Sequence, residues 1–429
     1  MKRRIIMYLY VFKDFDLYFA KGLENNAIVK FDSSIISEIN NHDIFFKKEY
    51  KEIIKDTFQK TNKQNKENSF VVVTNTNCNL RCSYCYEKNI CDTERLMIEE
   101  ENNSIYEFIY RNIKKSDARI FNIEFTGGEP LLNKKYIFRL VNKINRNLKE
   151  KIIKYSLVTN GILLEKEDIK FFNDNKFNIQ ITLDGSKKFH NQERIGLDIT
   201  NSFDIIIKNI KEYLNNSELL KITIRVNVSN KNKESIFELI DFLKIEFKNF
   251  INKSLNIYFD FLDVSNDDIN FLEYFEGTKI IAEIYYYLFK NNINVPYDFN
   301  IAGNCMARNS TSVTITPEGK LLKCYSMVGD NNFFYEKDVY NNDVEIKNIP
   351  PILKNCDIMQ CPLYSKCMGG CGYKEYSNKN GFKINCNYES INYLNKLYFL
   401  FELSNEFGVY IENPLEMMNN VEIKKICFK

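Results

Sequence analysis

The chain has 429 residues, 44% of them hydrophobic and 27% charged, which is enough apolar sequence for two or three folded domains and excludes a disordered chain. Its net charge is only +2, which argues against a nucleic-acid or membrane-surface partner. The first residues are basic and then apolar, as in a signal peptide, but Lys13, Asp14 and Asp16 interrupt the apolar run too early for one. No apolar run reaches the ~18 residues of a membrane span. We therefore expect a cytoplasmic protein, in which twelve cysteines predict metal binding rather than disulfides.

Residues 1–66 are predicted to combine short strands with helices. Aromatic and β-branched runs at 5–12, 15–22 and 26–32 are separated by turn-forming residues and predict three strands. Helical spacing follows in SSIISEIN, whose opening serine pair offers an N-cap, and again in KKEYKEIIKDTF. The polar stretch QKTNKQNKENS that comes next is typical of a linker.

From residue 67 to residue 290 the pattern alternates between strands and helices. Six strand candidates lie at 70–74, 121–126, 153–159, 177–183, 222–228 and 255–262. Helical stretches between them include 104–115, 134–148 and 233–247. Repeated β–α units predict parallel strands in a curved sheet, an α/β fold of the partial (β/α)6, TIM-like kind. Ligands of such folds bind in the loops after the strands, and here those loops carry a cysteine motif, GGEP, TNG and DG in turn.

The loop after the first of these strands, residues 74–87 with the sequence TNTNCNLRCSYCYE, is called the cysteine loop here. It holds Cys78, Cys82 and Cys85 in the spacing C-x3-C-x2-C. A closed metal site takes four protein ligands, so three predict a metal group that keeps one position for an exchangeable ligand. This spacing can wrap three corners of a [4Fe–4S] cluster, and a zinc site with a distant fourth ligand is the alternative.

With GGEP on the next strand and six β–α units around it, the stretch 70–262 closely resembles the radical S-adenosylmethionine (SAM) enzymes. The resemblance implies that the free iron of the cluster binds SAM, and that one electron cleaves SAM to methionine and a 5′-deoxyadenosyl radical, which abstracts a substrate hydrogen. A reductant such as flavodoxin or ferredoxin is then expected as a partner. The resemblance names no catalytic residue, and it implies cofactor-binding roles for Tyr84, Gly127, Gly128, Glu129, Asn160, Thr182, Arg194 and Asn227.

Within that set, the resemblance assigns different parts of SAM to different residues. The GGEP residues are expected at the SAM amino group, where Glu129 would pair with an ammonium. Thr182 and Arg194 are expected at the SAM carboxylate. Asn160 and Asn227 are expected to line the site.

Residues 291–429 are loop-rich, with one predicted hairpin at 312–324 and one predicted closing helix at 389–403. Because the stretch has little apolar periodicity, we expect bound metal to stabilise its fold. Their cysteines resemble the SPASM extension, in which radical SAM maturases of peptides hold two auxiliary [4Fe–4S] clusters. The resemblance implies a closed cluster on Cys356, Cys361, Cys367 and Cys386, and an open one on Cys305, Cys324 and Cys371. Together with the SAM-binding cluster, the resemblance implies three [4Fe–4S] clusters.

The cysteine pattern departs from the family at some points. Four residues separate Cys356 from Cys361, where the family commonly has two, and no additional cysteine lies near Phe299. A zinc ribbon is the alternative, which the spacing C-x5-C-x3-C fits poorly. Cys91 and Cys427 are expected to be small buried hydrophobic residues, with Cys427 as a second candidate for the open cluster.

The SPASM resemblance implies a polypeptide substrate, and residues 1–66 resemble a winged-helix-like element that binds the leader of a ribosomal precursor peptide by strand addition. A hairpin decoration of the barrel is the alternative. We therefore expect three domains: a recognition element (1–66), a radical SAM partial barrel (67–290) and a SPASM auxiliary-cluster domain (291–429).

An open auxiliary iron suits a substrate thiolate, which predicts thioether formation between a cysteine sulfur and a carbon. One rival is formylglycine formation in sulfatases, whose enzymes place an aspartate where Tyr325 follows Cys324. Peptide epimerisation and carbon–carbon crosslinking on the same scaffold are further rivals. The non-enzyme alternative is an iron–sulfur electron carrier or a peptide-binding module.

Overall fold

The structure is a computed structural model, and it divides into two compact units. One unit, called the barrel unit here, comprises residues 65–296 and 306–352, and the other, called the terminal unit, comprises residues 1–64, 297–305 and 353–429. The terminal unit thus joins both ends of the chain. The structure describes residues 8–14, 17–23, 27–59, 68–85, 87, 97–100, 102–196, 199–262, 274–296, 305–308, 311–328, 338–340, 361–363, 367, 371 and 388–428.

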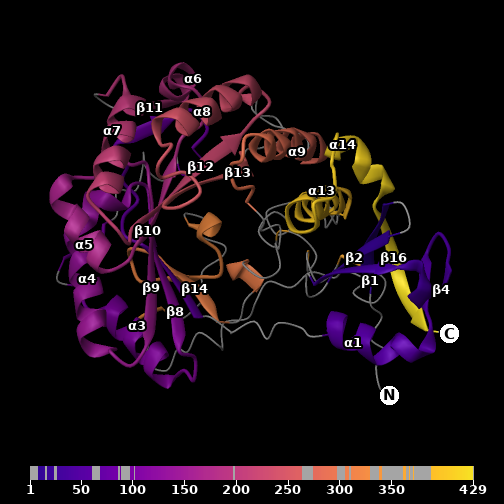
Figure 1. Cartoon of the computed structure of the whole chain (residues 1–429). Coiled ribbons are helices and arrows are strands. Elements are labelled where there is room, and N and C mark those ends of the chain that lie inside the picture. Colours follow the sequence, from indigo (N-terminus) through magenta and orange to yellow (C-terminus); the bar gives the residue numbers. More distant parts are fainter. Residues whose placement is uncertain are drawn as a thin grey trace, which may run out of the picture. The chain divides into compact units, whose positions relative to one another are not determined.

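The barrel unit contains all six predicted parallel strands. They lie side by side in chain order and curl into a partial barrel (Figure 1). Each strand pairs in parallel with the next, so all six C-terminal ends meet at one edge. The strands are β6 (Asn68–Val73), β8 (Ile120–Thr126), β9 (Ile152–Thr159), β10 (Asn178–Thr182), β12 (Lys221–Val228) and β13 (Leu255–Phe261).

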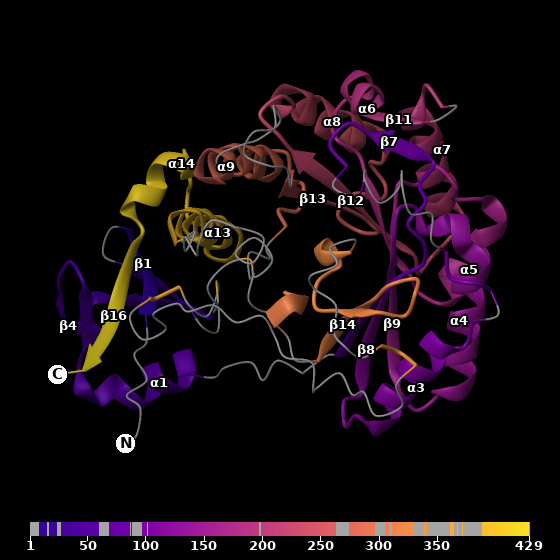
Figure 2. The same cartoon turned by 180° about the vertical axis from the view of Figure 1, so that it is seen from behind.

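Helices follow the strands and cover one face of this sheet (Figures 1 and 2). Every second strand residue is fully buried beneath them, as Phe121, Ile123 and Phe125 are on β8, because successive strand residues point to opposite faces. The predicted helices at 104–115, 134–148 and 233–247 are confirmed. The helices are α3 (Ser104–Lys115), α4 (Lys134–Asn147), α5 (Ile169–Asp174), α6 (Lys187–Glu193), α7 (Ser202–Asn215), α8 (Lys233–Glu246) and α9 (Tyr274–Lys290).

The predicted hairpin at 312–324 is confirmed as β14 (Ser312–Ile315) and β15 (Leu321–Leu322), which pair antiparallel. Gly319 has φ +84° in the turn between them, a conformation that glycine adopts without strain. The hairpin does not stand alone, because β14 pairs in parallel with β6 and extends the barrel sheet to eight strands. It therefore covers the edge that β6 would otherwise expose.

The terminal unit contains a six-stranded sheet in the order β3-β2-β1-β16-β5-β4. The last strand of the chain lies at its centre, antiparallel to β1 and parallel to β5. The three predicted strands at 5–12, 15–22 and 26–32 are confirmed, whereas β4, β5 and β16 were not predicted. The strands are β1 (Tyr8–Asp14), β2 (Leu17–Gly22), β3 (Ile28–Asp32), β4 (Ile36–Ile39), β5 (Asp43–Phe46) and β16 (Glu422–Phe428).

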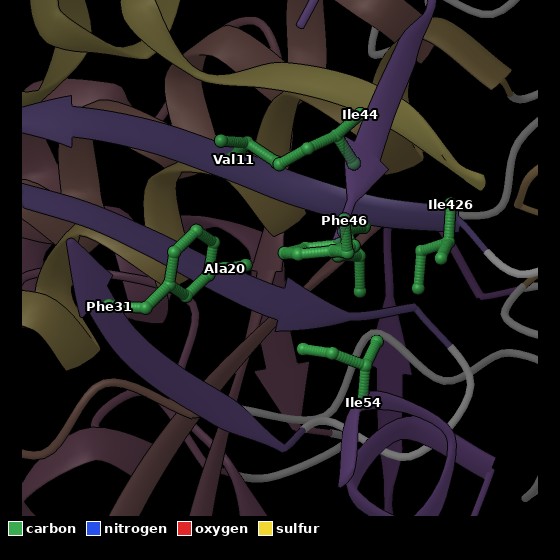
Figure 3. Close-up of a cluster of buried hydrophobic side chains, with 8 residues drawn as sticks. Val11, Ala20, Phe31, Ile44, Phe46, Ile54 and Ile426 are labelled. Carbon is green, nitrogen blue, oxygen red and sulfur yellow. The ribbon is translucent and has the colours of Figure 1, made fainter. Parts of the chain in front are cut away.

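A compact hydrophobic core holds this sheet to helix α1 (Lys51–Gln59). Figure 3 shows Ile54 of α1 beneath side chains of the sheet, which come from β1, β2, β3, β5 and β16. Because Ile426 belongs to β16, the core needs both ends of the chain. Its residues are Leu9, Val11, Ala20, Phe31, Ile44, Phe46, Ile54 and Ile426.

The prediction of a helix in SSIISEIN, residues 33–40, is wrong. A short 3-10 helix, η1 (Ser33–Ile35), leads into strand β4, which pairs antiparallel with β5 across a bulge. Both isoleucines of β4 are β-branched, and pairing with a neighbouring strand outweighs a short helical spacing. The helix predicted at 47–58 is confirmed as η2 (Lys48–Tyr50) and α1.

The predicted closing helix at 389–403 is confirmed as α13 (Tyr388–Phe407), which is followed by α14 (Pro414–Met417). Among the helices that the structure describes, none combines the length and the apolarity that crossing a membrane requires. The other 3-10 helices of the described residues are η3 (Pro130–Asn133), η4 (Lys166–Asp168), η5 (Met306–Arg308), η6 (Tyr325–Met327) and η8 (Met418–Asn420).

Candidate functional site

The cysteine loop leaves the barrel after β6, and its backbone touches the backbone of the loop after β8. The Gly128 N–H donates to the Asn75 carbonyl oxygen (3.1 Å), and the Glu129 N–H donates to the Asn77 carbonyl oxygen (2.7 Å). A Cβ atom added at Gly127 or at Gly128 would stand 2.3 Å from one of these two carbonyl oxygens. The glycine pair therefore allows the two loops to approach closely. The contact of these glycines with the SAM amino group stays a prediction.

Glu129 lies wholly inside the barrel unit, with an exposed fraction of 0%. One carboxylate oxygen accepts hydrogen bonds from the Thr159 hydroxyl (2.6 Å) and the Leu131 N–H (3.0 Å), and the other accepts from the Asn160 N–H (2.8 Å). Burial raises the pKa of this carboxyl, and the three hydrogen bonds lower it in part. Its side chain therefore ties the loop after β8 to the loop after β9, and its contact with SAM stays a prediction.

Asn160 continues this connection to the cysteine loop. Its side-chain amide donates to the Asn79 side-chain oxygen (2.7 Å) and lies 3.9 Å from the Cys78 sulfur. The Cys78 sulfur also accepts the Leu80 N–H (3.4 Å). Burial raises the pKa of the Cys78 thiol to about 12, and a bound metal ion would reverse that effect by its positive charge. The structure thus places Asn160, expected as a lining residue, beside the first cysteine.

The far side of the cysteine loop is held by a short two-stranded sheet. Strand β7 (Leu80–Cys82) pairs antiparallel with β11 (Arg194–Gly196), so that Cys82 lies opposite Arg194. Figure 2 shows β7 beside β11 near α6 and α7. The Ser83 N–H donates to the Glu193 carbonyl oxygen (2.9 Å), and its hydroxyl bonds to the Glu193 carboxylate. The segment that carries Arg194 is therefore part of the support of the loop.

Tyr84, between the second and third cysteines, reaches into a buried polar group that we call the Asp184 cluster: Tyr84, Asp184, Arg194 and Asn227. The Tyr84 hydroxyl donates to the Asp184 carboxylate and accepts from the Arg194 guanidinium (2.7 Å). The Asn227 side chain donates to the same carboxylate (3.0 Å). The structure thus brings together three residues that the sequence predicted, around one that it missed. The only signal for Asp184 was its place in the DG turn after β10.

Charges in the Asp184 cluster shift the pKa values of its members. Burial raises the pKa of the Tyr84 hydroxyl well above its usual value, and neighbouring Asp184 adds to this effect. Burial alone would lower the pKa of Arg194, but neighbouring Cys82, Tyr84 and Asp184 together hold it high. Arg194 therefore stays a cation beside the second cysteine. Thr182, the other residue expected at the SAM carboxylate, ends β10 with a buried side chain.

The donor set of the cysteine loop fits a [4Fe–4S] cluster. It offers three thiols, and two buried N–H donors near them, Arg194 Nε and Asn79 Nδ2, have no hydrogen-bond partner among the described residues. An anionic group such as a thiolate-bound cluster or the carboxylate of SAM would satisfy such donors. No three cysteine, histidine or acidic residues of the described ranges are arranged to hold a single metal ion. In a [4Fe–4S] cluster each thiolate binds its own iron, so the thiols need not converge on one ion.

The cysteines of the C-terminal stretch are described only in part. Cys305, Cys324, Cys361, Cys367 and Cys371 are half-buried, whereas Cys356, Cys386, Cys91 and Phe299 lie outside the described residues. Cys305 and Cys371 belong to the terminal unit and Cys324 to the barrel unit, so the auxiliary ligand sets stay predictions.

Cys427 lies on β16, where its sulfur is 3.7 Å from the Asp43 carboxylate of β5. Burial, and then Asp43, raise the pKa of this thiol. It is half-buried in the terminal sheet rather than in a deep core.

The face of the barrel sheet opposite the helices carries a polar row that the sequence did not predict. Arg225 donates to the Asn227 side-chain oxygen (3.0 Å) and to the Asp260 carboxylate (3.3 Å). Tyr325, which is 36% exposed as a residue, has its hydroxyl near these charges: desolvation of the hydroxyl raises its pKa, the Arg225 guanidinium lowers it in part, and neighbouring Cys324 and Asp260 raise it further. Alternating polar residues on β12 and β13 were the signal for this row.

Comparison with known proteins identifies the domain around the cysteine loop. The model of the radical SAM superfamily matches residues 72–243. The chain is also similar to the cysteine-type anaerobic sulfatase-maturating enzyme of Clostridium novyi (strain NT), with 26% identity over 358 residues that cover 73% of this chain and 90% of that protein.

Solved structures show the same fold. Native anSMEcpe with bound AdoMet superposes with a TM-score of 0.60 at 18% identity, covering 82% of this chain and 99% of that one. Streptococcus suis SuiB bound to the precursor peptide SuiA superposes with a TM-score of 0.53 at 17% identity, covering 87% and 96%. Residues 72–243 of this chain are a radical SAM domain.

Proposed function

We propose that this radical SAM enzyme is a peptide maturase that joins a cysteine sulfur to a carbon of another residue in a ribosomally made precursor peptide. Support for a peptide substrate comes from the likeness to SuiB, which was solved with its precursor peptide, and to a sulfatase-maturating enzyme. Bound at the cysteine loop, a [4Fe–4S] cluster and SAM would supply the hydrogen-abstracting chemistry. Cys78, Cys82 and Cys85 would hold that cluster.

The observation that favours thioether formation is Tyr325. Oxidation of a substrate cysteine or serine to formylglycine removes a hydrogen atom and then a proton from the side chain, so it needs a base. The enzymes that carry out that reaction place an aspartate after the cysteine that corresponds to Cys324. Tyr325 is 36% exposed, and a phenol with the ordinary tyrosine pKa of about 10 is already protonated at neutral pH, so it is a poor base.

The auxiliary cysteines support the same reaction. Cys305, Cys324 and Cys371 would hold a cluster with one open iron, which suits a soft thiolate ligand from the substrate. Coordination would keep that sulfur deprotonated and close to the reacting carbon. Cys356, Cys361, Cys367 and Cys386 would hold the closed cluster, for three clusters in all.

Leader recognition is proposed for the terminal unit. Its sheet ends in two edge strands, β3 and β4, and most residues of β4 are exposed. An extended leader peptide can add to such an edge through its backbone hydrogen bonds. The reductant would be a small electron carrier such as flavodoxin or ferredoxin.

The test is mass spectrometry of a precursor peptide after anaerobic incubation with the reconstituted enzyme, reductant and SAM. The natural candidate is the product of a neighbouring short reading frame that encodes cysteines. We expect a product that has lost two hydrogen atoms and one free thiol, and no product from the same peptide with serine in place of cysteine. A product in which an aldehyde replaces the cysteine side chain would instead establish formylglycine formation, which the similarity to the Clostridium novyi enzyme favours.

A further inference from the structure

Asp184 lies at the centre of a buried polar network beside the cysteine loop, the Asp184 cluster. We propose that Asp184 is a positioning residue, which fixes Tyr84 and Arg194 and through them the arrangement in which the cysteine loop binds its cluster. The proposal concerns the radical SAM domain itself and does not depend on which peptide bond is formed.

The two carboxylate oxygens of Asp184 face different parts of the unit. Oδ2 accepts from the Tyr84 hydroxyl, which belongs to the cysteine loop, and lies 3.5 Å from the Arg194 guanidinium. Oδ1 accepts from the backbone N–H (3.2 Å) and the side-chain amide (3.0 Å) of Asn227, which belongs to β12. The carboxylate therefore bridges the loop and the barrel sheet.

The barrel fixes the backbone of Asp184 as well as its side chain. The Asp184 carbonyl oxygen accepts from the Asn232 side chain (2.9 Å), which also donates to the Asn227 carbonyl oxygen (2.7 Å). The next residue, Gly185, has φ +143°, and a Cβ atom there would stand 2.3 Å from the Ser235 hydroxyl oxygen. Because this turn is anchored at several points, Asp184 is the fixed partner and the Tyr84 side of the loop is the part that it holds.

Asp184 also neutralises Arg194, which is only 8% exposed and lies opposite Cys82 in the β7–β11 pair. A buried cation needs a partner charge, and the interaction between charges is strong where water is excluded. Without the carboxylate, the Arg194 charge would act unbalanced on the cluster beside it. Reduction adds an electron to the cluster, so loss of this negative charge makes reduction easier.

The principal test is Asp184→Asn in the full, reconstituted chain, because asparagine keeps the shape and removes the charge. Asp168→Asn is the matched control, since Asp168 is also buried and pairs with Lys134 of α4 (3.1 Å) rather than with the cysteine loop. We expect Asp184→Asn to shift the midpoint potential of the SAM-binding cluster to a more positive value, measured by a redox titration followed by electron paramagnetic resonance. Asp168→Asn should leave that potential unchanged.

Tyr84→Phe keeps the Asp184–Arg194 pair and removes only the hydroxyl that joins it to the loop, so it decides the question if Asp184→Asn does not fold. We expect it to release the iron of this cluster to a chelator about tenfold faster, as the loss of one charge-assisted hydrogen bond implies. Iron released from the auxiliary clusters is told apart by comparison with the Cys78→Ala, Cys82→Ala, Cys85→Ala triple variant. The kinetic phase of iron release that this variant lacks belongs to the SAM-binding cluster. A parental release rate in Tyr84→Phe, or a parental potential in folded Asp184→Asn, would overturn the proposal.

Discussion

The barrel unit and the terminal unit both rest on an open sheet, but they hold their important contacts in opposite ways. At the cysteine loop, the barrel unit brings two backbones together where side chains are absent, at Gly127 and Gly128. The terminal unit depends on side chains that are present, in a core that joins β16 to strands at the start of the chain. The first arrangement should be sensitive to one added methyl group, and the second to the loss of one large side chain.

The largest effect on stability should come from Phe46→Ala in the terminal core. Phe46 is fully buried and packs edge-on against Phe31 with ring centroids 5.6 Å apart. Its truncation should lower the free energy of unfolding of this unit by about 3–5 kcal/mol. Turnover of a leader-bearing peptide should fall, whereas SAM cleavage without peptide should continue. Phe46→Leu is the milder control. Equal loss of peptide turnover and of SAM cleavage would show that peptide recognition is not confined to the terminal unit and SAM cleavage to the barrel unit.

Gly128→Ala should disrupt the site at the cysteine loop by adding a methyl group rather than by removing a side chain. The added methyl group would stand 2.3 Å from the Asn77 carbonyl oxygen, so the two loops must separate. Overpacking of this kind costs about 1–3 kcal/mol, and SAM cleavage should fall with it. Gly408→Ala is the control for backbone strain without overpacking, because nothing lies within 4 Å of the added atom but Gly408 has φ +66°. Parental SAM cleavage by Gly128→Ala would contradict the close contact.

Glu129→Ala should weaken SAM binding by about 1.5–3 kcal/mol while leaving the iron content unchanged. The variant leaves the Thr159 hydroxyl and the Leu131 and Asn160 N–H groups without their acceptor. The loop after β9 should therefore loosen where Asn160 meets Asn79. Equilibrium binding of SAM to the reconstituted variant measures the effect. An unchanged affinity for SAM would show that the glutamate of GGEP, Glu129, does not contribute to SAM binding.

The smallest effect concerns pH. Burial, and then Arg194, lower the pKa of His190 well below its usual value, so the folded chain keeps this imidazole neutral. Below about pH 6.5 the unfolded chain binds a proton that the folded chain does not, so stability falls as the pH falls, by about 1.4 kcal/mol per pH unit at most. Denaturant unfolding at pH 7 and pH 5.5 measures this loss. His190→Gln should flatten the dependence, and an equal slope in both proteins would refute it.

The sequence predicted the barrel better than the terminal sheet because the barrel is built from local units. Strand β8 and helix α3 each follow from the spacing of their own apolar residues, and each pairs or packs with its neighbour in the chain. Strand β16 could not be predicted in its place, since its partners β1 and β5 lie at the other end of the chain. The helix predicted at 33–40 failed for a related reason, because β4 pairs with the next strand, β5, and β5 is itself held in the sheet by the distant β16.

The candidate site divides in a similar way. Cys78, Cys82, Cys85 and GGEP carry spacings that are visible in the sequence, and the parallel strands bring them to one edge. Asp184 and Arg225 carry no such spacing. Their importance depends on hydrogen bonds to Tyr84 and Asn227, which come from other strands and loops. A buried polar network of this kind becomes visible only when the fold has placed its members.

The central claim, that the cysteine loop holds the cluster that cleaves SAM, is tested most directly by one measurement. The parent chain and the Cys78→Ala, Cys82→Ala, Cys85→Ala triple variant are reconstituted anaerobically, reduced, and supplied with SAM, and 5′-deoxyadenosine and iron are quantified together. The parent should hold about 10–12 iron atoms and form 5′-deoxyadenosine, and the variant should hold about four fewer and form none. Formation of 5′-deoxyadenosine by the triple variant would contradict the account.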